Sequence, residues 1–407
     1  MRIIDVLNIV LIIADIFKTT AQTSYLIQQD VFLPKTIKHD LLPQRESFKM
    51  DSVVLRYPLP LLEEKFDSLN QGKRRSVFTI KTLHGFEFSE ASSALQKSIR
   101  RGHWKDALQW AVEMSMVPIA GKSNAWNRLF VVSVEDVGPA DVKQFMIVKA
   151  LYELYLEDKD NPLYAVTAAV SLAKAKKTRV SDWAIHVYKF SQSDVKDENV
   201  EDLVEDLVDN FFDKKLWKTL YASAKLMATS GKVKIKGIRV TIPIKVAIVK
   251  IQKELEYLIQ DENKKNYMRC IMKRAINKIT GPNKNKKNPC RGGEGILFFV
   301  HFINVWMFDV EYGFDVDIKP DESLLPLIDK VIEGDIHGIP DYALDIHTRR
   351  GKKMKRDFDH FNKVGALLIN EDEKWKAYSK FCFDKLIDRL DGVEMLESYD
   401  SEFVNAK

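Results

Sequence analysis

Residues 89–114 read SEASSALQKSIRRGHWKDALQWAVEM and predict two helices joined by a very short turn. Ser89 is suited to be the N-cap of the first helix, and Gly102 to end it in the left-handed conformation. Because about two residues separate the helices, they must pack antiparallel or cross steeply, as an αα-hairpin. Apolar residues recur with the spacing of one helix face in both halves, at Ala91, Ala94, Leu95 and Ile99 and then at Trp104, Ala107, Leu108, Ala111 and Val112.

The same helical pattern continues along the next part of the chain. An apolar segment from Trp126 to Val137 ends at Gly138-Pro139, a pair that stops one helix and starts another. Asp160-Asn161-Pro162 supplies a cap and a proline for the next helix, and Ser181-Asp182 begins one more. We therefore expect about five or six packed helices over residues 78–192, without a fixed repeat.

The composition is that of a globular, helical protein. Hydrophobic residues make up 45% of the 407 residues, which is enough for a sizeable core, and 17 glycines and 13 prolines are few for a fold with many turns. The net charge of +5 excludes no class of partner, so the placement of the charge matters more. Cys270, Cys290 and Cys382 are far apart and form no CxxC motif. We expect no disulfide and no zinc site, but an intracellular, reducing compartment such as the cytoplasm or nucleus.

Residues 1–77 contain an apolar segment followed by an irregular arm with several prolines. The segment from Ile3 to Phe17 is too short to span a bilayer and contains Asp5 and Asp15. We expect a packed or peripheral helix here and no membrane span. A signal peptide or anchor, and a translation start at Met50, are the alternatives.

The second half of the chain alternates between patterns. Residues 194–213 hold nine acids and one lysine with apolar residues at helical spacing, and predict an amphipathic helix with an acidic face. Residues 233–244 alternate apolar and polar residues as a strand does, and Pro243 would confine that strand to an edge. Residues 252–279 return to the helical pattern, and residues 297–308 predict a buried helix.

The sequence predicts no nucleotide-binding loop and no cofactor. Gly121-Lys122-Ser123 is the nearest match to the pattern GxxxxGK[ST], whose glycines let backbone amides wrap phosphates. Met116 stands where the first glycine is needed, and Pro118 interrupts the loop.

A first basic segment covers residues 264–291, which carry ten Lys or Arg and no acid. Such density favours contact with phosphates, because each neutralised phosphate releases counterions. The alternative is a solvated lysine-rich loop that contacts nothing. The candidate nucleic-acid-binding residues of this segment are Arg269, Lys273, Arg274, Lys284, Lys286 and Lys287.

A second basic segment lies within residues 340–361, which read PDYALDIHTRRGKKMKRDFDHF. Pro340 is suited to the first position of a helix whose end would carry the cations. Asp341, Asp345 and His347 could instead ligate a metal in an enzyme acting on nucleic acid, although their spacing matches no metal signature. Structural ion pairs are the third interpretation. The candidate nucleic-acid-binding residues here are Arg349, Arg350, Lys352, Lys353 and Arg356.

Glu135-Asp136 is a pair of carboxylates at the end of an apolar helix. Paired carboxylates can perform acid–base chemistry or hold magnesium. Capping of the next helix, or ion pairs with Arg100, Arg101 or Arg128, is the commoner explanation.

Residues 93–114, 126–141 and 168–184 resemble the helical C-terminal region of the replication-associated AAA+ ATPases of the MgsA/RarA/Werner-helicase-interacting group. One departure is Val134, which is inserted between Ser133 and the acids, and Pro139 is another. The family pattern "ALxKSxRG" is matched by Lys97, Ser98, Arg100, Arg101 and Gly102, and "SEDIGxAD" by Ser133, Glu135, Asp136, Gly138, Ala140 and Asp141.

Residues 340–361 resemble the "PDYALDxHTRRGRxMGRxxxHF" block of stand-alone proteins of phages and large DNA viruses, in which it follows such a helical region. Asp341, Asp345 and His347 match the block, whereas Lys355 stands where the block has a glycine. The resemblance covers about 120 residues of the first region and about 50 near the end. It implies an all-helical oligomerisation and accessory domain without an ATPase module of its own.

These patterns predict an all-α fold with packed αα-hairpins, a second helical domain and a minor β element. The expected domains are an N-terminal apolar segment and arm (1–77), a helical domain like a clamp-loader collar (78–215), a connector with a β-like stretch (216–244), a basic helical domain (245–390) and a C-terminal tail (391–407).

We expect a non-catalytic accessory protein of DNA replication or repair that binds nucleic acid or a replication complex. The chain is also a candidate for forming a homo-oligomer. Lys97, Arg100 and Arg101 of the first motif join the candidate nucleic-acid-binding residues. One alternative is the metal-dependent enzyme described above. The other is an adaptor between proteins, whose acidic face at residues 194–213 meets a basic partner.

Overall fold

The described residues of the computed structural model form an all-α fold with one short pair of strands. They all lie within the compact unit of residues 57–407. The predicted segment at residues 3–17 and the tail at 391–407 lie outside them. The described residues are 69–70, 80–117, 120–190, 199–228, 233–235, 238–240, 242–280, 293–310, 312 and 318–388.

The predicted αα-hairpin is formed by α3 (Phe88–Arg100) and α4 (Trp104–Ser115), which pack against each other. Gly102 lies between them with φ of +69°, as its position in the sequence indicates. The predicted N-cap at Ser89 is wrong, because α3 begins at Phe88 and Glu87 occupies the N-cap position, two residues before Ser89. Phe88 is buried in the core, so its burial extends the helix beyond the residue that could have capped it.

The next helices are those predicted between residues 120 and 190. α5 (Ala120–Glu135) is followed by a 3₁₀ turn at Gly138–Ala140 and then by α6 (Lys143–Glu157). The alanine-rich α7 (Leu163–Lys174) packs on α4 and α6, since its small side chains permit close approach. α8 (Val180–Phe190) begins within a residue or two of the predicted start.

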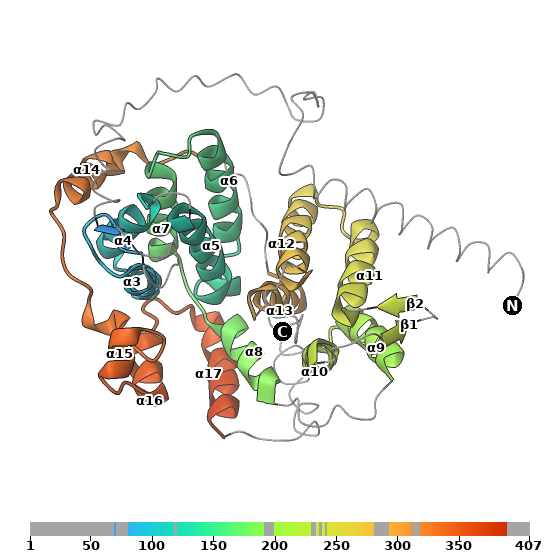
Figure 1. Ribbon diagram of the computed structural model, residues 1–407. Coiled ribbons are helices and arrows are strands. Elements are labelled where there is room, and N and C mark those ends of the chain that lie inside the picture. The colour runs from blue at the N-terminus through green and yellow to red at the C-terminus, as the bar shows by residue number, and fades with distance from the viewer. Residues whose placement is uncertain are drawn as a thin grey trace, which may run out of the picture. The chain divides into compact units, whose positions relative to one another are not determined.

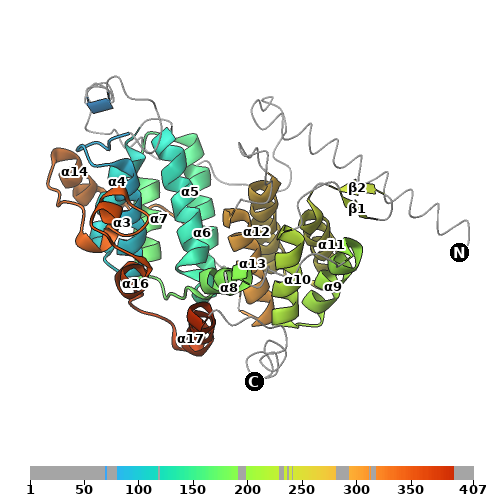
Figure 2. The ribbon, with the colours of Figure 1, turned by 60° about the horizontal axis from the view of Figure 1, so that its bottom comes forward.

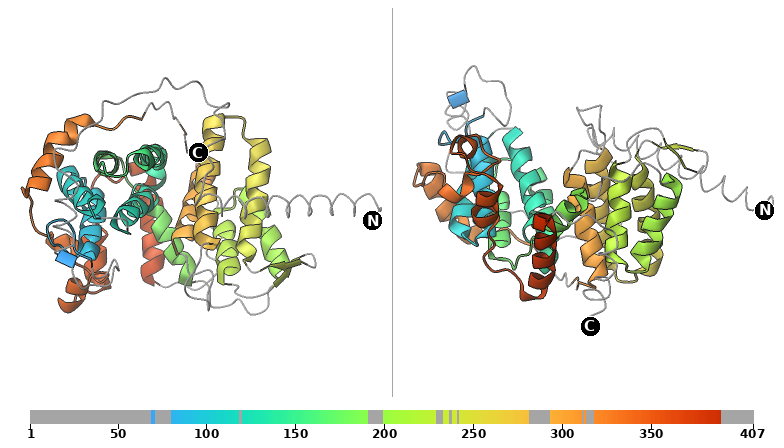
Figure 3. Two further views of the ribbon diagram at one scale, coloured as in Figure 1. Left: turned by 45° about the horizontal axis from the view of Figure 1, so that its top comes forward. Right: turned by 90° about the horizontal axis from the view of Figure 1, so that it is seen from below.

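A second group of helices lies side by side in Figure 3. Residues 200–212 of the predicted acidic segment form α9, which buries Leu203, Val204 and Phe211 and leaves its acids on the other face, as predicted. Residues 194–198 of that segment lie outside the described residues. The apolar segment forms the buried α13. The group consists of α9 (Val200–Phe212), α10 (Leu216–Ala228), α11 (Pro243–Leu258), α12 (Glu262–Thr280) and α13 (Gly293–Met307).

The predicted β-like stretch is shorter than its sequence pattern. β1 (Val233–Ile235) and β2 (Ile238–Val240) pair antiparallel, with Val233 opposite Val240. Pro243 does not lie on an edge strand but begins α11, because a proline is tolerated where the helix leaves its first N–H groups without partners.

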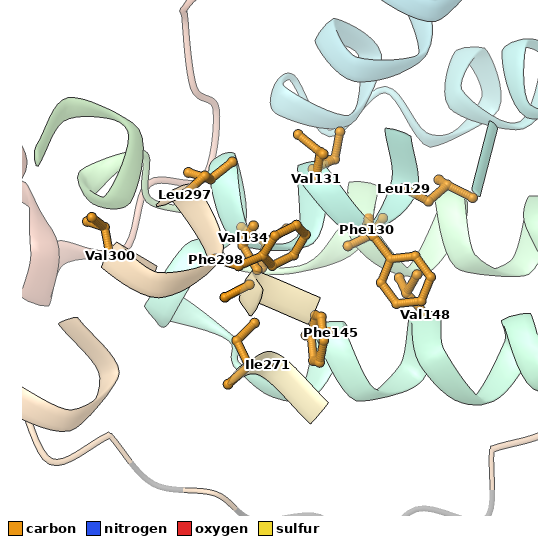
Figure 4. Packing of buried hydrophobic residues seen from close by; sticks show 14 of the residues in the cluster. Leu129, Phe130, Val131, Val134, Phe145, Val148, Ile271, Leu297, Phe298 and Val300 are labelled. Atoms are coloured by element: carbon orange, nitrogen blue, oxygen red, sulfur yellow. The ribbon is translucent and has the colours of Figure 1, made fainter. Parts of the chain in front are cut away.

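The two helix groups share one hydrophobic core, part of which appears in Figure 4. Phe145 of α6 packs edge-on against Tyr267 of α12 and Phe298 of α13, with ring centroids 5.8 and 6.2 Å apart. The guanidinium of Arg274 lies 3.7 Å from the centroid of Phe130 on α5. The core is therefore continuous across α5, α6, α12 and α13.

The last described residues return to the first helices, contrary to the predicted domain of residues 245–390. α14 (Leu325–Glu333) packs on α4, and α17 (Glu373–Asp388) packs on α8 (Figures 1 and 2). Between them lie α15 (Arg349–Lys353) and α16 (Phe358–His360). The apolar faces that α14 and α17 bury are complementary to the first group, which sequence periodicity alone cannot reveal.

Residues 340–361, called the C-terminal block below, do not form the helix predicted from Pro340. Pro340 is extended, and only a 3₁₀ turn at Asp341–Ala343 follows it. Helix begins at α15, where the Thr348 hydroxyl accepts a hydrogen bond of 3.1 Å from the Gly351 N–H. The Ala343 carbonyl accepts hydrogen bonds from Ser93 and Lys97 of α3 instead of an intrahelical one.

α15 ends in a tight turn that uses a lysine where the resembling block has a glycine. Lys355 adopts φ of +58°. Its N–H donates to the Lys352 carbonyl at 3.0 Å, and the Arg356 N–H donates to the Gly351 carbonyl at 3.1 Å. This is the hydrogen-bond pattern of a Schellman motif, so the departure at Lys355 leaves the turn intact.

Gly351 allows the C-terminal block to fold tightly on itself. A Cβ at this position would lie 2.1 Å from the carbonyl oxygen of Asp345. We predict that Gly351→Ala lowers the free energy of unfolding by about 2–3 kcal/mol, because backbone atoms must move to admit the methyl group. Urea denaturation measures this change. Gly338→Ala is the control, since a Cβ there meets nothing within 4 Å; equal effects of the two substitutions would contradict the prediction.

Candidate functional site

The C-terminal block closes a cleft of about 480 Å³ against the first helices. The cleft is lined by side chains from α3, α5, the beginnings of α8 and α13, and residues 345–361. Three of the segments quoted for the family resemblance therefore meet the C-terminal block in one place. This makes the cleft the candidate functional site.

A buried ion pair joins α3 to the C-terminal block. The Nζ of Lys97 lies 2.7 Å from Oδ2 of Asp345, and both side chains are at least 95% buried. Lys97 also donates to the Ser93 hydroxyl and to the Ala343 carbonyl. Burial lowers the pKa of Lys97 to about 8, although Asp345 opposes this shift. The pair thus satisfies charges that neither segment could bury alone.

The pKa of Asp345 is held below its usual range in spite of its burial. Burial by itself raises the pKa, but hydrogen bonds from His347 and the charge of Lys97 outweigh this effect. The backbone N–H of His347 donates to Oδ1 at 2.9 Å, and its ring Nδ1 lies 3.3 Å from Oδ2. Asp345 is therefore a fixed anion that orients its neighbours.

Glu135 and Asp136 are held by two arginines. Arg100 pairs with Glu135 at 2.8 Å and also binds Asp136. Arg179, which directly precedes α8, lies 3.2 Å from Asp136. Gln96 of α3 donates hydrogen bonds to both carboxylates. Burial raises the pKa of Asp136, while Arg100 opposes this. The arrangement corresponds to the structural interpretation of this acidic pair, with Arg179 in the place expected for Arg101 or Arg128.

Gly138 brings Arg179 to these acids. Its φ of +59° is in the left-handed region, and a Cβ would lie 2.6 Å from the Thr178 carbonyl oxygen. The Thr178 N–H donates to the Val137 carbonyl at 3.2 Å. Asp141, the last residue of this motif, lies outside the cleft and accepts a hydrogen bond from Gln144.

Further polar contacts attach the C-terminal block to the αα-hairpin. The Tyr342 hydroxyl donates to Asp106 at 2.9 Å and lies 3.0 Å from the Ser98 hydroxyl. The guanidinium of Arg101 lies 4.3 Å from the Tyr342 ring centroid and donates to the Val364 carbonyl. Ser98 and Arg101 of the motif on α3 therefore contact the C-terminal block and hold it against the αα-hairpin.

The metal site considered for Asp341, Asp345 and His347 is not formed. Asp341 binds Arg356, Asp345 binds Lys97, and the His347 side chain is 62% exposed. Across the described residues, no group of three His, Cys, Asp or Glu is arranged to hold a metal ion.

Several of the cations predicted to bind nucleic acid are buried or packed against the core. Lys97, Arg100 and Arg101 are buried as described above, and burial removes them from any phosphate on the surface. Arg274 lies against Phe130 and donates to Asn127. These assignments are corrected, because the charges serve the fold.

Other candidate cations differ in how far they are neutralised. Arg269 is exposed but binds Glu256 through two hydrogen bonds, and Arg356 binds Asp341. Arg350 approaches Glu90 at 3.3 Å. Lys284, Lys286 and Lys287 lie outside the described residues. Among the candidate cations that the structure describes, four are exposed and form no ion pair with another described residue: Lys273, Arg349, Lys352 and Lys353.

Four residues of the cleft lining were not among the predicted site residues, namely Arg128, Arg179, Trp183 and Phe358. Arg179 and Trp183 lie within the segment 168–184, so the resemblance included them without assigning them a role. No sequence pattern distinguishes a buried arginine from an exposed one, and Phe358 lies in a segment whose helical pattern is too short to assign a face.

Comparisons with protein-family models, curated proteins and solved structures found no match to this chain. The family resemblance thus stays a prediction that depends on the quoted residues. Of the helices that the structure describes, none is both long and apolar enough to cross a membrane.

The Lys97–Asp345 pair can be tested with a double-mutant cycle. We predict that Lys97→Met and Asp345→Asn each lower the free energy of unfolding by about 3 kcal/mol or more, because each leaves a buried polar partner unpaired. The double variant should lose less than the sum of the two, by more than about 1 kcal/mol.

Chemical denaturation measures all three values. The control is Glu153→Gln at the exposed Lys149–Glu153 pair, where we expect a change below about 0.5 kcal/mol. Strictly additive effects at Lys97 and Asp345 would contradict the role given to the pair.

Proposed function

We propose that this chain is a non-catalytic accessory protein of DNA replication or repair that binds nucleic acid through exposed cations at α15. These cations are Arg349, Lys352, Lys353 and Lys355, called the α15 cations below. The quoted resemblance supports the replication and repair context, replication proteins as partners and self-association. The three widely spaced cysteines support a reducing intracellular compartment.

The proposed binding role rests on the exposure of these four side chains and on their lack of described partners. All four are exposed, and none makes a hydrogen bond or ion pair with another described residue. Most cations of the neighbouring network are neutralised by acids or buried, as Lys97 and Arg100 are. Unneutralised cations within a few residues of one another attract a phosphate backbone.

The backbone beneath the α15 cations is fixed at both ends. Thr348 caps α15, and the turn at Lys355 closes it with two hydrogen bonds. Arg356 then donates to the carbonyls of Asp341 and Leu344. A fixed backbone lowers the entropy lost on binding, although the lysine side chains themselves stay free. Contacts of this kind recognise phosphates and give little sequence preference.

We predict that Arg349→Glu combined with Lys352→Glu weakens binding to nucleic acid of any sequence and lowers the slope of log affinity against log salt concentration by about 1 per lost phosphate contact. Fluorescence anisotropy with labelled single-stranded and double-stranded DNA and RNA, between about 50 and 200 mM salt, measures both quantities. Arg350 is left unchanged, because a negative charge at this position would repel Glu90.

The control is Lys159→Glu combined with Lys253→Glu, which changes the net charge equally at exposed lysines elsewhere. Equal loss of affinity in the control would assign the binding to total charge instead of to α15. Absence of binding by the unaltered chain at low salt would remove the proposal and favour the adaptor between proteins.

A further inference from the structure

One arginine in the cleft wall has a hydrogen-bond donor that no described residue accepts. The Arg179 side chain is only 2% exposed, and it lines the cleft. Its Nη1 is buried and has no hydrogen-bond partner among the described residues. An unpaired buried donor is unfavourable, so the cleft wall at Arg179 contains a hydrogen-bond donor that the described residues leave unsatisfied.

A second arginine of the cleft, Arg128, has no counter-charge among the described residues. Arg128 donates to the Ser92 hydroxyl at 3.2 Å and to the amide oxygen of Gln96 at 3.1 Å, which are both neutral. No described acid forms an ion pair with it. The acids of the cleft already have cationic partners: Asp345 has Lys97, and Glu294 has Lys278. The charge of Arg128 therefore favours an anionic ligand, and its planar guanidinium suits a phosphate.

The cleft also has aromatic walls. Phe358 is 44% exposed although it lies in the cleft lining, and its ring centroid is 6.2 Å from that of the buried Phe361. Trp183 lines the cleft as well, with the Arg179 guanidinium 4.4 Å from its ring centroid. An accessible aromatic ring in a polar cleft is a stacking surface for a nucleobase.

We propose that the cleft holds one nucleotide unit of a bound nucleic-acid strand, with its base against Phe358 and its phosphate at Arg128. The inference rests on the proposed function, since the α15 cations hold the adjoining backbone. Thr348 lines the cleft and is followed directly by Arg349, so both sets of contacts belong to one path. The volume of about 480 Å³ lies within the range of about 300–1,000 Å³ that is usual for small-molecule sites.

Stacking and charge contacts can be separated by their dependence on salt. We expect Phe358→Ala to weaken binding of a labelled twelve-base single-stranded oligonucleotide at least about fivefold with an unchanged salt slope, because stacking releases no counterions. Arg128→Gln should weaken it and lower the slope. The control is Leu156→Ala, which removes a side chain of similar exposure, 46%, outside the cleft. Thermal denaturation shows whether each variant is folded.

Titration calorimetry with deoxyadenosine monophosphate distinguishes a strand from a free nucleotide. The proposal expects this mononucleotide to bind weakly, to lose binding in Phe358→Ala, and to compete with the oligonucleotide. Oligonucleotide affinity that is unchanged in Phe358→Ala and Arg128→Gln overturns the inference, even if mononucleotide binding is lost, and leaves the proposed function standing. No oligonucleotide binding by the unaltered chain defeats the proposed function and this inference together.

Discussion

The contact between Lys97 and Asp345 is the constraint on which the arrangement of the cleft depends. A lysine ammonium buried on α3 needs an anion and hydrogen-bond acceptors, and the chain supplies them from a segment almost 250 residues away. Because the C-terminal block must reach Lys97, it cannot extend into the helix that its proline and acids indicate. The extended turn before α15 follows from this requirement.

The cations on and around the cleft fall into two groups with different roles. Arg100 and Arg179 bind Glu135 and Asp136 where α3, α5 and the start of α8 meet, and they contribute to folding. The α15 cations face outward and have no described partner. The sequence alone does not separate these groups, because the end of α3 and the C-terminal block both contain an Arg-Arg-Gly sequence, at residues 100–102 and 349–351. Burial and the position of acids decide which cations remain for a ligand.

The helical architecture could be predicted from the sequence because it depends on local spacing. Apolar residues at three- and four-residue intervals indicated the hairpin of α3 and α4, and Gly102 indicated where it turns. The start of α3 and the conformation after Pro340 could not be predicted, since burial of Phe88 and docking of the C-terminal block overrule the local signals. The cleft depends on partners distant in the sequence, so only its quoted motifs could be anticipated.

The same buried network explains how the cleft can contain Arg128 without an acidic partner and Arg179 with one unpaired donor. Arg128 and Arg179 lie on elements whose positions are fixed by other contacts, namely the core around Phe130 and the acids at the end of α5. A rigid frame can hold a donor in an unfavourable setting, because relaxation would require the frame to move. Such a donor is arranged before any ligand arrives, and a ligand that satisfies it gains affinity without the cost of ordering the site. The stability of the ion-pair network and the ability of the cleft to bind are thus consequences of one packing arrangement.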